Sequence, residues 1–181
     1  MKFMIASDIH GSAYYCDKML EAFRAEGAGR LLLLGDLLYH GPRNDLPKDY
    51  APKEVIKMLN QVKEDVFCVR GNCEAQVDQM VLEFPVMATY AVIPFKDNII
   101  FATHGHKFNE NSLLPLKRGD VLLNGHTHIP KYTAHESYIY VNPGSVSRPK
   151  EGSKNSYMLF EDGRFIWKDV EMRICYMEHE I

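Results

Sequence analysis

The chain has 181 residues, of which 46% are hydrophobic and 25% are charged, and its formal net charge at pH 7 is -3. This balance is typical of a globular protein with one sizeable core, so we expect a single domain spanning residues 1–181. The net charge gives no general attraction to nucleic acid or to an anionic membrane, and the longest apolar runs are too short for a membrane span or a signal peptide.

The first apolar run, residues 3–6, predicts a strand covered on both faces, and Asp8, His10 and Gly11 follow it. Residues two apart in an extended chain point the same way, so the side chains of Asp8 and His10 can leave one strand end together. Gly11 lets the chain turn sharply away. Apolar residues at helical spacing then predict a helix that ends near Gly27.

A second apolar run, residues 31–34, ends on a glycine and Asp36. A strand, a helix and a strand within this length predict a right-handed βαβ unit, with Asp8 and Asp36 at the same edge of the sheet. Ligands in such sheets gather at that edge. Residues 37–51, which include Arg43, have no periodicity and predict a long functional loop.

The rest of the chain repeats the pattern of short strands followed by polar residues. We expect a helix that starts at Pro52 and a third helix over residues 77–84. From residue 85 onward short strands and turns replace helices, with a terminal hairpin and a further strand in the alternating tail after Val170. The expected strands cover residues 66–70, 91–93, 99–103, 121–124, 139–141, 157–160 and 165–168.

Residues of metal-ligand type therefore recur at the ends of apolar strands. Any one of them alone is more often a helix cap, a turn residue or a hydrogen-bonded histidine than a ligand. Seven of them at strand ends, often beside glycine, are not easily independent accidents. The seven are Asp8, His10, Asp36, Asn72, His104, His126 and His128.

These residues resemble, in order and spacing, the five sequence blocks of calcineurin-like metallophosphoesterases. The resemblance covers residues 8–128, and the short length together with residues 41–44, 71–73 and 142–145 is similar to the small prokaryotic phosphodiesterase branch. The blocks are Asp8-x-His10, Gly35-Asp36, Gly71-Asn72, His104 and Gly125-His126-x-His128.

The resemblance implies a four-layer αββα sandwich of two mixed β-sheets flanked by helices, with two divalent metal ions per chain at its edge. Oxygen and nitrogen ligands without thiolate suit Mn²⁺, Fe²⁺ or Zn²⁺; the family's common use of manganese favours Mn²⁺, with Ni²⁺ and Mg²⁺ as further candidates. The resemblance also implies that Asp8, His10 and His128 hold the first metal and that Asn72, His104 and His126 hold the second. Asp36 would bridge the two metals.

The implied reaction is metal-dependent hydrolysis of a phosphodiester. Two metal ions that share a water lower its pKa, so a bridging hydroxide can attack phosphorus in line near neutral pH. The resemblance makes Asp36, Asn72, Cys73 and His104 the expected catalytic residues.

Cys73 departs from the pattern, because many family members have a histidine directly after the asparagine. A thiol, with a reference pKa of about 8.5, is a poorer proton donor at pH 7 than an imidazolium. We therefore expect phosphodiesters to be preferred over phosphomonoesters. The alternative is that Cys73 is only a small packing residue.

Other polar residues are weaker candidates. Arg43 and His106 are the expected substrate-binding residues, Arg43 because a guanidinium matches phosphate oxygens and His106 because it follows His104 by two positions. Arg70 and Arg148 are further phosphate-binding candidates that are more often structural.

Two other readings compete with a phosphodiesterase. A retromer subunit of this fold acts as an interaction scaffold and has lost part of the ligand set, whereas every ligand position is filled here. An amidohydrolase-type or β-lactamase-type hydrolase does not fit the order of the histidines or the chain length.

The expected partner is a small phosphodiester substrate, with no specific nucleic-acid or membrane binding. The tail after Val170 would suit an edge strand that pairs with a second copy, so a homo-oligomer stays open. Four cysteines without a C-x-x-C pair suit a reducing compartment, and we expect the protein to be cytoplasmic.

Overall fold

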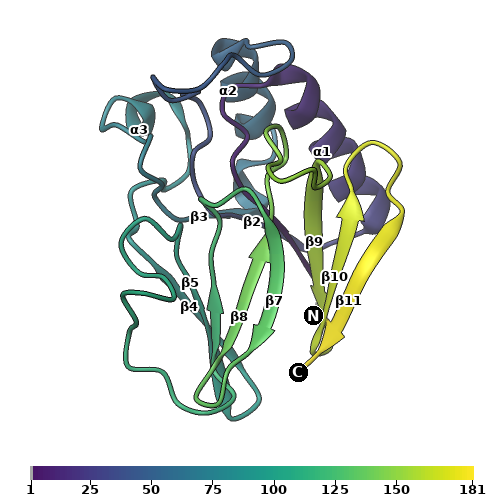
Figure 1. The fold of residues 1–181 in the computed structure, drawn as a ribbon. Helices are drawn as coiled ribbons and strands as arrows, with labels where there is room; N and C mark the ends of the chain where they lie inside the picture. Colours follow the sequence, from purple (N-terminus) through teal and green to yellow (C-terminus); the bar gives the residue numbers. More distant parts are fainter. Residues whose placement is uncertain (1) are drawn as a thin grey trace.

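The apolar runs of the first half of the chain become parallel strands of one mixed sheet (Figure 1). The computed structural model describes residues 2–181. Strands from the end of the chain extend this sheet by antiparallel pairing, so its order is β11-β10-β9-β1-β2-β3. Its strands are β1 (Lys2–Ala6), β2 (Arg30–Leu33), β3 (Val66–Cys68), β9 (Ser156–Glu161), β10 (Arg164–Asp169) and β11 (Cys175–Glu180).

The middle of the chain forms a second mixed sheet with the order β4-β5-β6-β8-β7. Strands β5, β6 and β8 are parallel, and antiparallel strands flank them on both sides. Its strands are β4 (Ala91–Phe95), β5 (Asn98–Ala102), β6 (Val121–Leu123), β7 (Pro130–Ala134) and β8 (Ile139–Pro143).

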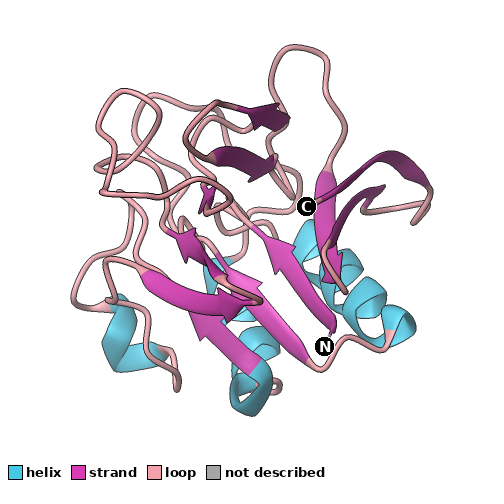
Figure 2. Cartoon of the chain, turned by 90° about the horizontal axis from the view of Figure 1, so that it is seen from below, coloured by secondary structure: helices cyan, strands magenta, loops and turns pink. Residues whose placement is uncertain are grey.

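Two helices cover the outer face of the first sheet, α1 (Ala13–Glu26) and α2 (Pro52–Asn60). The Ser12 side chain caps α1 by accepting a hydrogen bond from the Tyr15 amide, and Gly27 ends the helix in the left-handed conformation. A 3₁₀ turn (Lys63–Asp65) and the one-turn helix α3 (Asp78–Val81) complete the helical part of residues 2–181. In Figure 2 the helices lie along one side of the strands, with loops on the opposite side.

Alternation along the strands divides the apolar side chains between layers. In β5, Ile100 and Ala102 face the core between the two sheets, whereas Phe101 belongs to a separate cluster on the outer face of the second sheet. Leu114 and Leu116 pack against that cluster, so a loop rather than a helix covers this face. The two mixed sheets are as predicted.

Three sequence-based expectations about elements need correction. The helix expected over residues 77–84 is only α3, because its apolar side chains Val77 and Met80 are exposed and have no core to pack on. Strand β7 was not expected, since its sequence has no clear apolar alternation. The tail strand begins only at Cys175, after a turn.

The carboxyl ends of parallel strands from both sheets meet at one edge of the sandwich. Backbone hydrogen bonds hold this edge together: the Val146 amide donates to the Ser7 carbonyl at 3.0 Å, and the Gly125 amide donates to the His104 carbonyl at 2.9 Å. The Asp8 amide also donates to the Gly35 carbonyl at 3.1 Å, so these bonds join the segment after β1 to those after β2 and β8, and the segment after β5 to that after β6. No helix within residues 2–181 is long and apolar enough to cross a membrane.

Candidate metal centre

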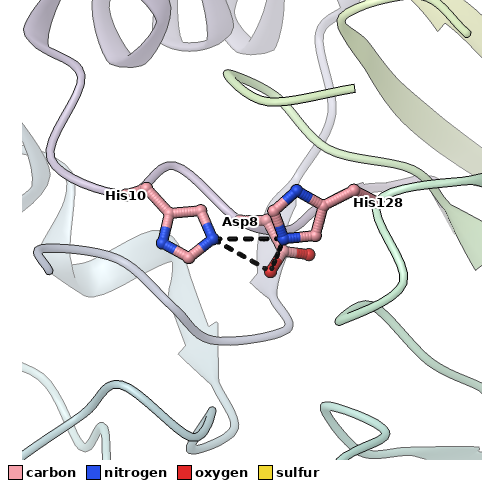
Figure 3. Close-up of side chains that lie close together, drawn as sticks. All are labelled: Asp8, His10 and His128. Carbon is pink, nitrogen blue, oxygen red and sulfur yellow. Dashed lines mark hydrogen bonds and ion pairs between the residues drawn. The ribbon is translucent and has the colours of Figure 1, made fainter. Parts of the chain in front are cut away.

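Asp8, His10 and His128 form the first cluster at this edge, and their side chains point toward one another (Figure 3). The Nε2 atoms of His10 and His128 lie 3.2 Å apart. The Oδ1 atom of Asp8 lies 3.5 Å from the Nε2 of His10 and 3.2 Å from that of His128. All three residues are buried, and His128 joins the other two although it lies 118 residues after His10.

Asp36 joins this first cluster to a second one. Its Oδ2 atom lies 3.8 Å from the Nε2 of His10 and 3.5 Å from the Nε2 of His104. The same nitrogen of His104 lies 3.1 Å from the Oδ1 of Asn72 and 3.2 Å from the Nδ1 of His126. The structure therefore brings together all seven residues of the predicted ligand set, with Asp36 in the central position predicted for the bridge.

Backbone carbonyls fix the direction of three imidazoles. The Nδ1 atom of His10 lies 2.7 Å from the Tyr39 carbonyl, that of His104 lies 2.6 Å from the Leu34 carbonyl, and that of His128 lies 2.7 Å from the Arg148 carbonyl. A carbonyl only accepts, so each Nδ1 donates and each Nε2 of a neutral ring is left with a lone pair. Lone pairs of His10 and His128 that meet at 3.2 Å repel one another unless a cation lies between them.

Each carboxylate uses its second oxygen to hold backbone. The Oδ2 atom of Asp8 accepts from the His126 amide at 3.0 Å, which ties the first sheet to the loop after β6. The Oδ1 atom of Asp36 accepts from the Cys73 amide at 2.9 Å. The remaining oxygen of Asp8, Oδ1, is buried and has no hydrogen-bond donor. An orphaned carboxylate oxygen among nitrogen lone pairs fits a bound metal ion.

The electrostatics of the cluster also favour positive charge. Burial alone would raise the pKa of Asp8, but the imidazoles of His10, His128 and His104 outweigh burial and hold that pKa well below its ordinary value. Burial would lower the pKa of His104, yet Asp36 and Asp8 raise it to about 9. The cluster therefore attracts cations, either as protons on its histidines or as metal ions. Its mixed oxygen and nitrogen donors suit a divalent first-row metal.

Strained backbone accompanies this cluster. Ten non-glycine residues within 2–181 have positive φ angles, and five of them are predicted ligands. Such conformations persist where the surrounding structure fixes them, and they concentrate at functional sites. The five are Asp8 (60°), His10 (50°), Asp36 (56°), His126 (66°) and His128 (64°).

Glycines beside the ligands allow close approach of neighbouring groups. A Cβ atom on Gly71 would lie 2.1 Å from the Oδ1 of Asp36, and one on Gly125 would lie 2.0 Å from the Ser7 hydroxyl oxygen. A side chain at Gly71 would displace the Asp36 carboxylate, and one at Gly125 would displace Ser7, the residue before Asp8. This explains why the ligand blocks contain glycine at these two positions.

Glu74 supports the site and was missed by the sequence analysis. Its carboxylate is buried and accepts from the backbone amides of Asp36 at 2.9 Å, Leu37 at 2.7 Å and Gly71 at 2.5 Å. Burial and the nearby charge of Asp36 raise the pKa of Glu74. The residue locks the segments that carry Asp36 and Asn72 onto each other. Its position directly after Cys73 was the only available sequence signal.

Cys73 lies inside the site. Its sulfur atom, a ring nitrogen of His10 and a carboxylate oxygen of Asp36 all lie within 4.8 Å of one another. The sulfur also accepts a hydrogen bond from the side-chain amide of Asn72 at 3.3 Å. Burial and the charge of Asp36 raise the pKa of its thiol, so the group stays neutral. The residue therefore contacts the centre rather than only filling space.

A pocket of about 350 Å³ opens over these residues, and we call it the main pocket. Arg43 lies in its wall, as expected for a substrate-binding residue, and so does Lys150, which the sequence analysis did not single out. The other lining residues are His10, Asp36, Gly41, Pro42, Asn44, Asn72, Cys73, His126 and His128.

The other candidates lie around this pocket. The ring of His106 lies beside those of His104 and His126, with centroids 5.5 and 6.3 Å away, but His106 does not line the main pocket. The guanidinium of Arg70 donates to the Glu74 carbonyl, and the Arg148 carbonyl accepts from His128. Substrate contacts of His106, Arg70 and Arg148 remain predictions.

The sequence of the chain is similar to those of known proteins. Residues 1–162 match the family model of the calcineurin-like phosphoesterase superfamily domain. Phosphodiesterase YfcE of Escherichia coli strain K12 is 46% identical over 162 residues, which are 90% of this chain and 88% of that protein.

Solved structures agree with this relationship. The structure of Yfce, a phosphoesterase from E. coli, superposes with a TM-score of 0.96 at 42% identity and covers both chains fully. Vacuolar Protein Sorting 29 from Cryptosporidium parvum has a TM-score of 0.66 at 17% identity, with 99% of this chain and 98% of that chain covered, which shows a shared fold alone.

Proposed function

The chain belongs to the calcineurin-like phosphoesterase superfamily and is a phosphoesterase, and we propose that it hydrolyses phosphodiesters in preference to phosphomonoesters with the help of two divalent metal ions. The convergence of seven side chains, with three imidazole Nδ1 atoms already bonded to backbone carbonyls, carries this proposal. We favour Mn²⁺ as the working ion.

The residues divide into two ligand groups that share Asp36. One ion would be held by Asp8, His10 and His128, and the second by Asn72, His104 and His126. When bound, such ions supply Lewis acidity, which activates water and stabilises charge on the phosphoryl oxygens.

The main pocket orients the substrate over this centre. Arg43 and Lys150 lie in its wall and bring positive charge toward the phosphate, and a guanidinium can hold two phosphate oxygens at once. The buried carboxylates of Asp8 and Asp36 fix the ligand geometry before substrate arrives, because each also binds a backbone amide. Binding energy is then available for positioning phosphorus.

The substrate preference follows from the residue beside the leaving group. Cys73 lines the main pocket next to Asp36, where many family members have histidine. A neutral thiol gives little help to a basic alkoxide, so diesters with good leaving groups should react best. Monoesters carry a further negative charge and gain less from this site.

The test compares turnover of bis(p-nitrophenyl) phosphate and p-nitrophenyl phosphate by Mn²⁺-loaded protein. Wild type should favour the diester, and Cys73→His should shift the ratio toward the monoester by about tenfold or more. Both esters release p-nitrophenolate, so the shift would come from a protonated imidazole that pairs with the additional negative charge of the monoester. Cys73→Ala serves as the control for packing. An unchanged ratio in Cys73→His would contradict the assigned role of Cys73.

A further inference from the structure

A second pocket lies next to the metal centre, and His126 lines both this pocket and the main pocket. Its volume is about 180 Å³, and we call it the side pocket. A phosphodiester has two ester arms, so a substrate at the centre can extend one arm into each pocket. The polar side chains that line the side pocket, apart from His126, are Asn109, Glu110, Asn111, Asn124, Thr127 and Tyr140.

Two hydroxyl groups in the side pocket are kept available as donors. The buried side-chain amide of Asn142 has two N–H groups and faces three acceptors, which are the Gly125 carbonyl at 2.8 Å, the Thr127 hydroxyl oxygen at 3.1 Å and the Tyr140 hydroxyl oxygen at 3.2 Å. The Oδ1 atom of Asn142 accepts from the Gly144 amide at 2.9 Å, which fixes this orientation of the amide. One N–H of Asn142 binds the Gly125 carbonyl and the other can bind the Tyr140 hydroxyl oxygen, while the Thr127 hydroxyl oxygen accepts from the Ile129 amide at 3.3 Å. Each hydroxyl can therefore direct its own proton toward a ligand.

The side pocket also offers acceptors. The Oδ1 atom of Asn124 is buried and has no hydrogen-bond partner within residues 2–181, although Asn124 lines the pocket. The carboxylate of Glu110 lies in the wall and is shared with Lys131 at 2.8 Å and His135 at 3.0 Å. Hydroxyl donors beside a carboxylate that can accept suit a group that both donates and accepts, which is the property of a hydroxyl.

Charge separates the two pockets. The main pocket has Arg43 and Lys150 in its wall, whereas the charged residue that lines the side pocket, apart from His126, is the anionic Glu110. Because Glu110 is paired with Lys131 and His135, the side pocket presents little net charge and suits a neutral arm. The side pocket has about half the volume of the main pocket, so it suits a small arm.

We propose that the side pocket binds the retained alcohol arm of the phosphodiester, and that this arm is a small neutral polyol of the size of glycerol. The inference rests on the proposed function, which places the leaving group beside Cys73 in the main pocket and therefore directs the retained arm past His126. Tyr140 and Thr127 donate to the hydroxyls of the arm.

Two substrates that differ only in the retained arm test this assignment. Glyceryl p-nitrophenyl phosphate and methyl p-nitrophenyl phosphate release the same leaving group, so their difference reports on the retained arm. Wild type should have a kcat/KM about tenfold higher for the glyceryl ester, mainly through a lower KM. Tyr140→Phe should lose at least fivefold more on the glyceryl ester than on the methyl ester, because one hydrogen bond is removed.

Tyr138→Phe is the matched control, since Tyr138 is also buried in the second-sheet cluster but does not line the side pocket. Equal kcat/KM values for the two esters in wild type, or equal losses in Tyr138→Phe and Tyr140→Phe, would overturn the assignment. If neither ester is hydrolysed, the proposed function fails. Calorimetric binding of glycerol 3-phosphate and methyl phosphate then decides on the side pocket, with tighter binding of the glycerol compound supporting it and equal binding overturning it.

Discussion

The two sheets supply different chemistry to one centre. Strand ends of the first sheet contribute both carboxylates, the Asn72 amide and one imidazole, whereas the second sheet contributes three imidazoles. Each carboxylate binds on two sides, because one oxygen faces the imidazoles and the other holds a backbone amide. Each anchored imidazole has only one nitrogen toward the centre.

We infer that the first sheet controls both the charge and the geometry of the site, whereas the second sheet mainly completes the ligand set. A change in a carboxylate should therefore cost more than a change in an imidazole of the second sheet.

Asp36→Asn should have the largest effect. The amide keeps an oxygen that can accept from the Cys73 amide, so the fold is retained while the charge between the two ligand groups is lost. We expect kcat/KM for a diester to fall on the order of 10³-fold. Elemental analysis should show the loss of one metal ion per chain.

His126→Gln provides the second-sheet partner of that experiment. It removes one nitrogen from the exposed side of the centre and leaves both carboxylates in place. Its loss of activity should be smaller than that of Asp36→Asn. A fully active Asp36→Asn, or a larger loss in His126→Gln, would break the contrast between the sheets.

Glu74→Gln should weaken the first-sheet side indirectly. The glutamine side chain has a single oxygen for the three amides that Glu74 now binds, and it brings an N–H group toward them. We expect Mn²⁺ affinity to fall 10- to 100-fold, roughly as for other residues that orient ligands. Metal titration of the folded variant measures this effect.

The exposed Glu64 offers the control for that titration, because Glu64→Gln changes the same side chain and charge outside the site. Wild-type Mn²⁺ affinity in Glu74→Gln would show that the buried carboxylate has no part in positioning the ligands.

Arg43→Ala should affect binding more than chemistry. The side chain lines the main pocket but belongs to neither ligand group, so KM for a diester should rise about tenfold while metal content stays the same. Arg118→Ala, outside the main pocket, is the control for the change in net charge. An increase in KM of the same size in both variants would mean that Arg43 acts only through long-range charge.

Glu26→Gln should give the smallest effect and leave the centre unchanged. The Glu26 carboxylate accepts from the Tyr157 hydroxyl and from Lys168, each at 2.7 Å, and links α1 to the first sheet away from the ligands. We expect the free energy of unfolding at pH 7 to fall by about 1–2 kcal/mol, with wild-type metal binding.

The pH dependence of this loss has a definite sign. Burial would raise the pKa of Glu26, but Lys168 and Tyr157 outweigh burial and lower it. The stabilisation is therefore present above the unfolded pKa of about 4.3 and is lost as pH falls through the lower folded value. Urea unfolding should show the difference between wild type and Glu26→Gln shrinking in acid. A constant difference would contradict the linkage.

Much of the centre could be predicted from sequence because strand ends fix where a side chain emerges. Asp8 and Asp36 follow buried parallel strands, so their proximity followed from the βαβ rule before any contact was known. The helical spacing of Val77 and Met80 was misleading, because the structure leaves both side chains exposed. Helical periodicity predicts that one face of a helix is apolar, but it does not predict which other element packs against that face.

Glu74 and the side pocket could not be predicted for a different reason. The three amides that meet the Glu74 carboxylate come from two segments about 35 residues apart, and their convergence depends on tertiary structure. The side pocket likewise combines Tyr140 with residues of the 105–111 loop, whose conformation has no sequence signature.

The most direct test of the central claim is a crystal structure of the protein grown with Mn²⁺, with anomalous scattering used to locate the metal. We expect two peaks about 3.5–4 Å apart, as in other two-metal sites, with the Asp36 carboxylate between them and the six other predicted ligands around them. A map without metal peaks among these seven side chains at saturating Mn²⁺ would contradict it.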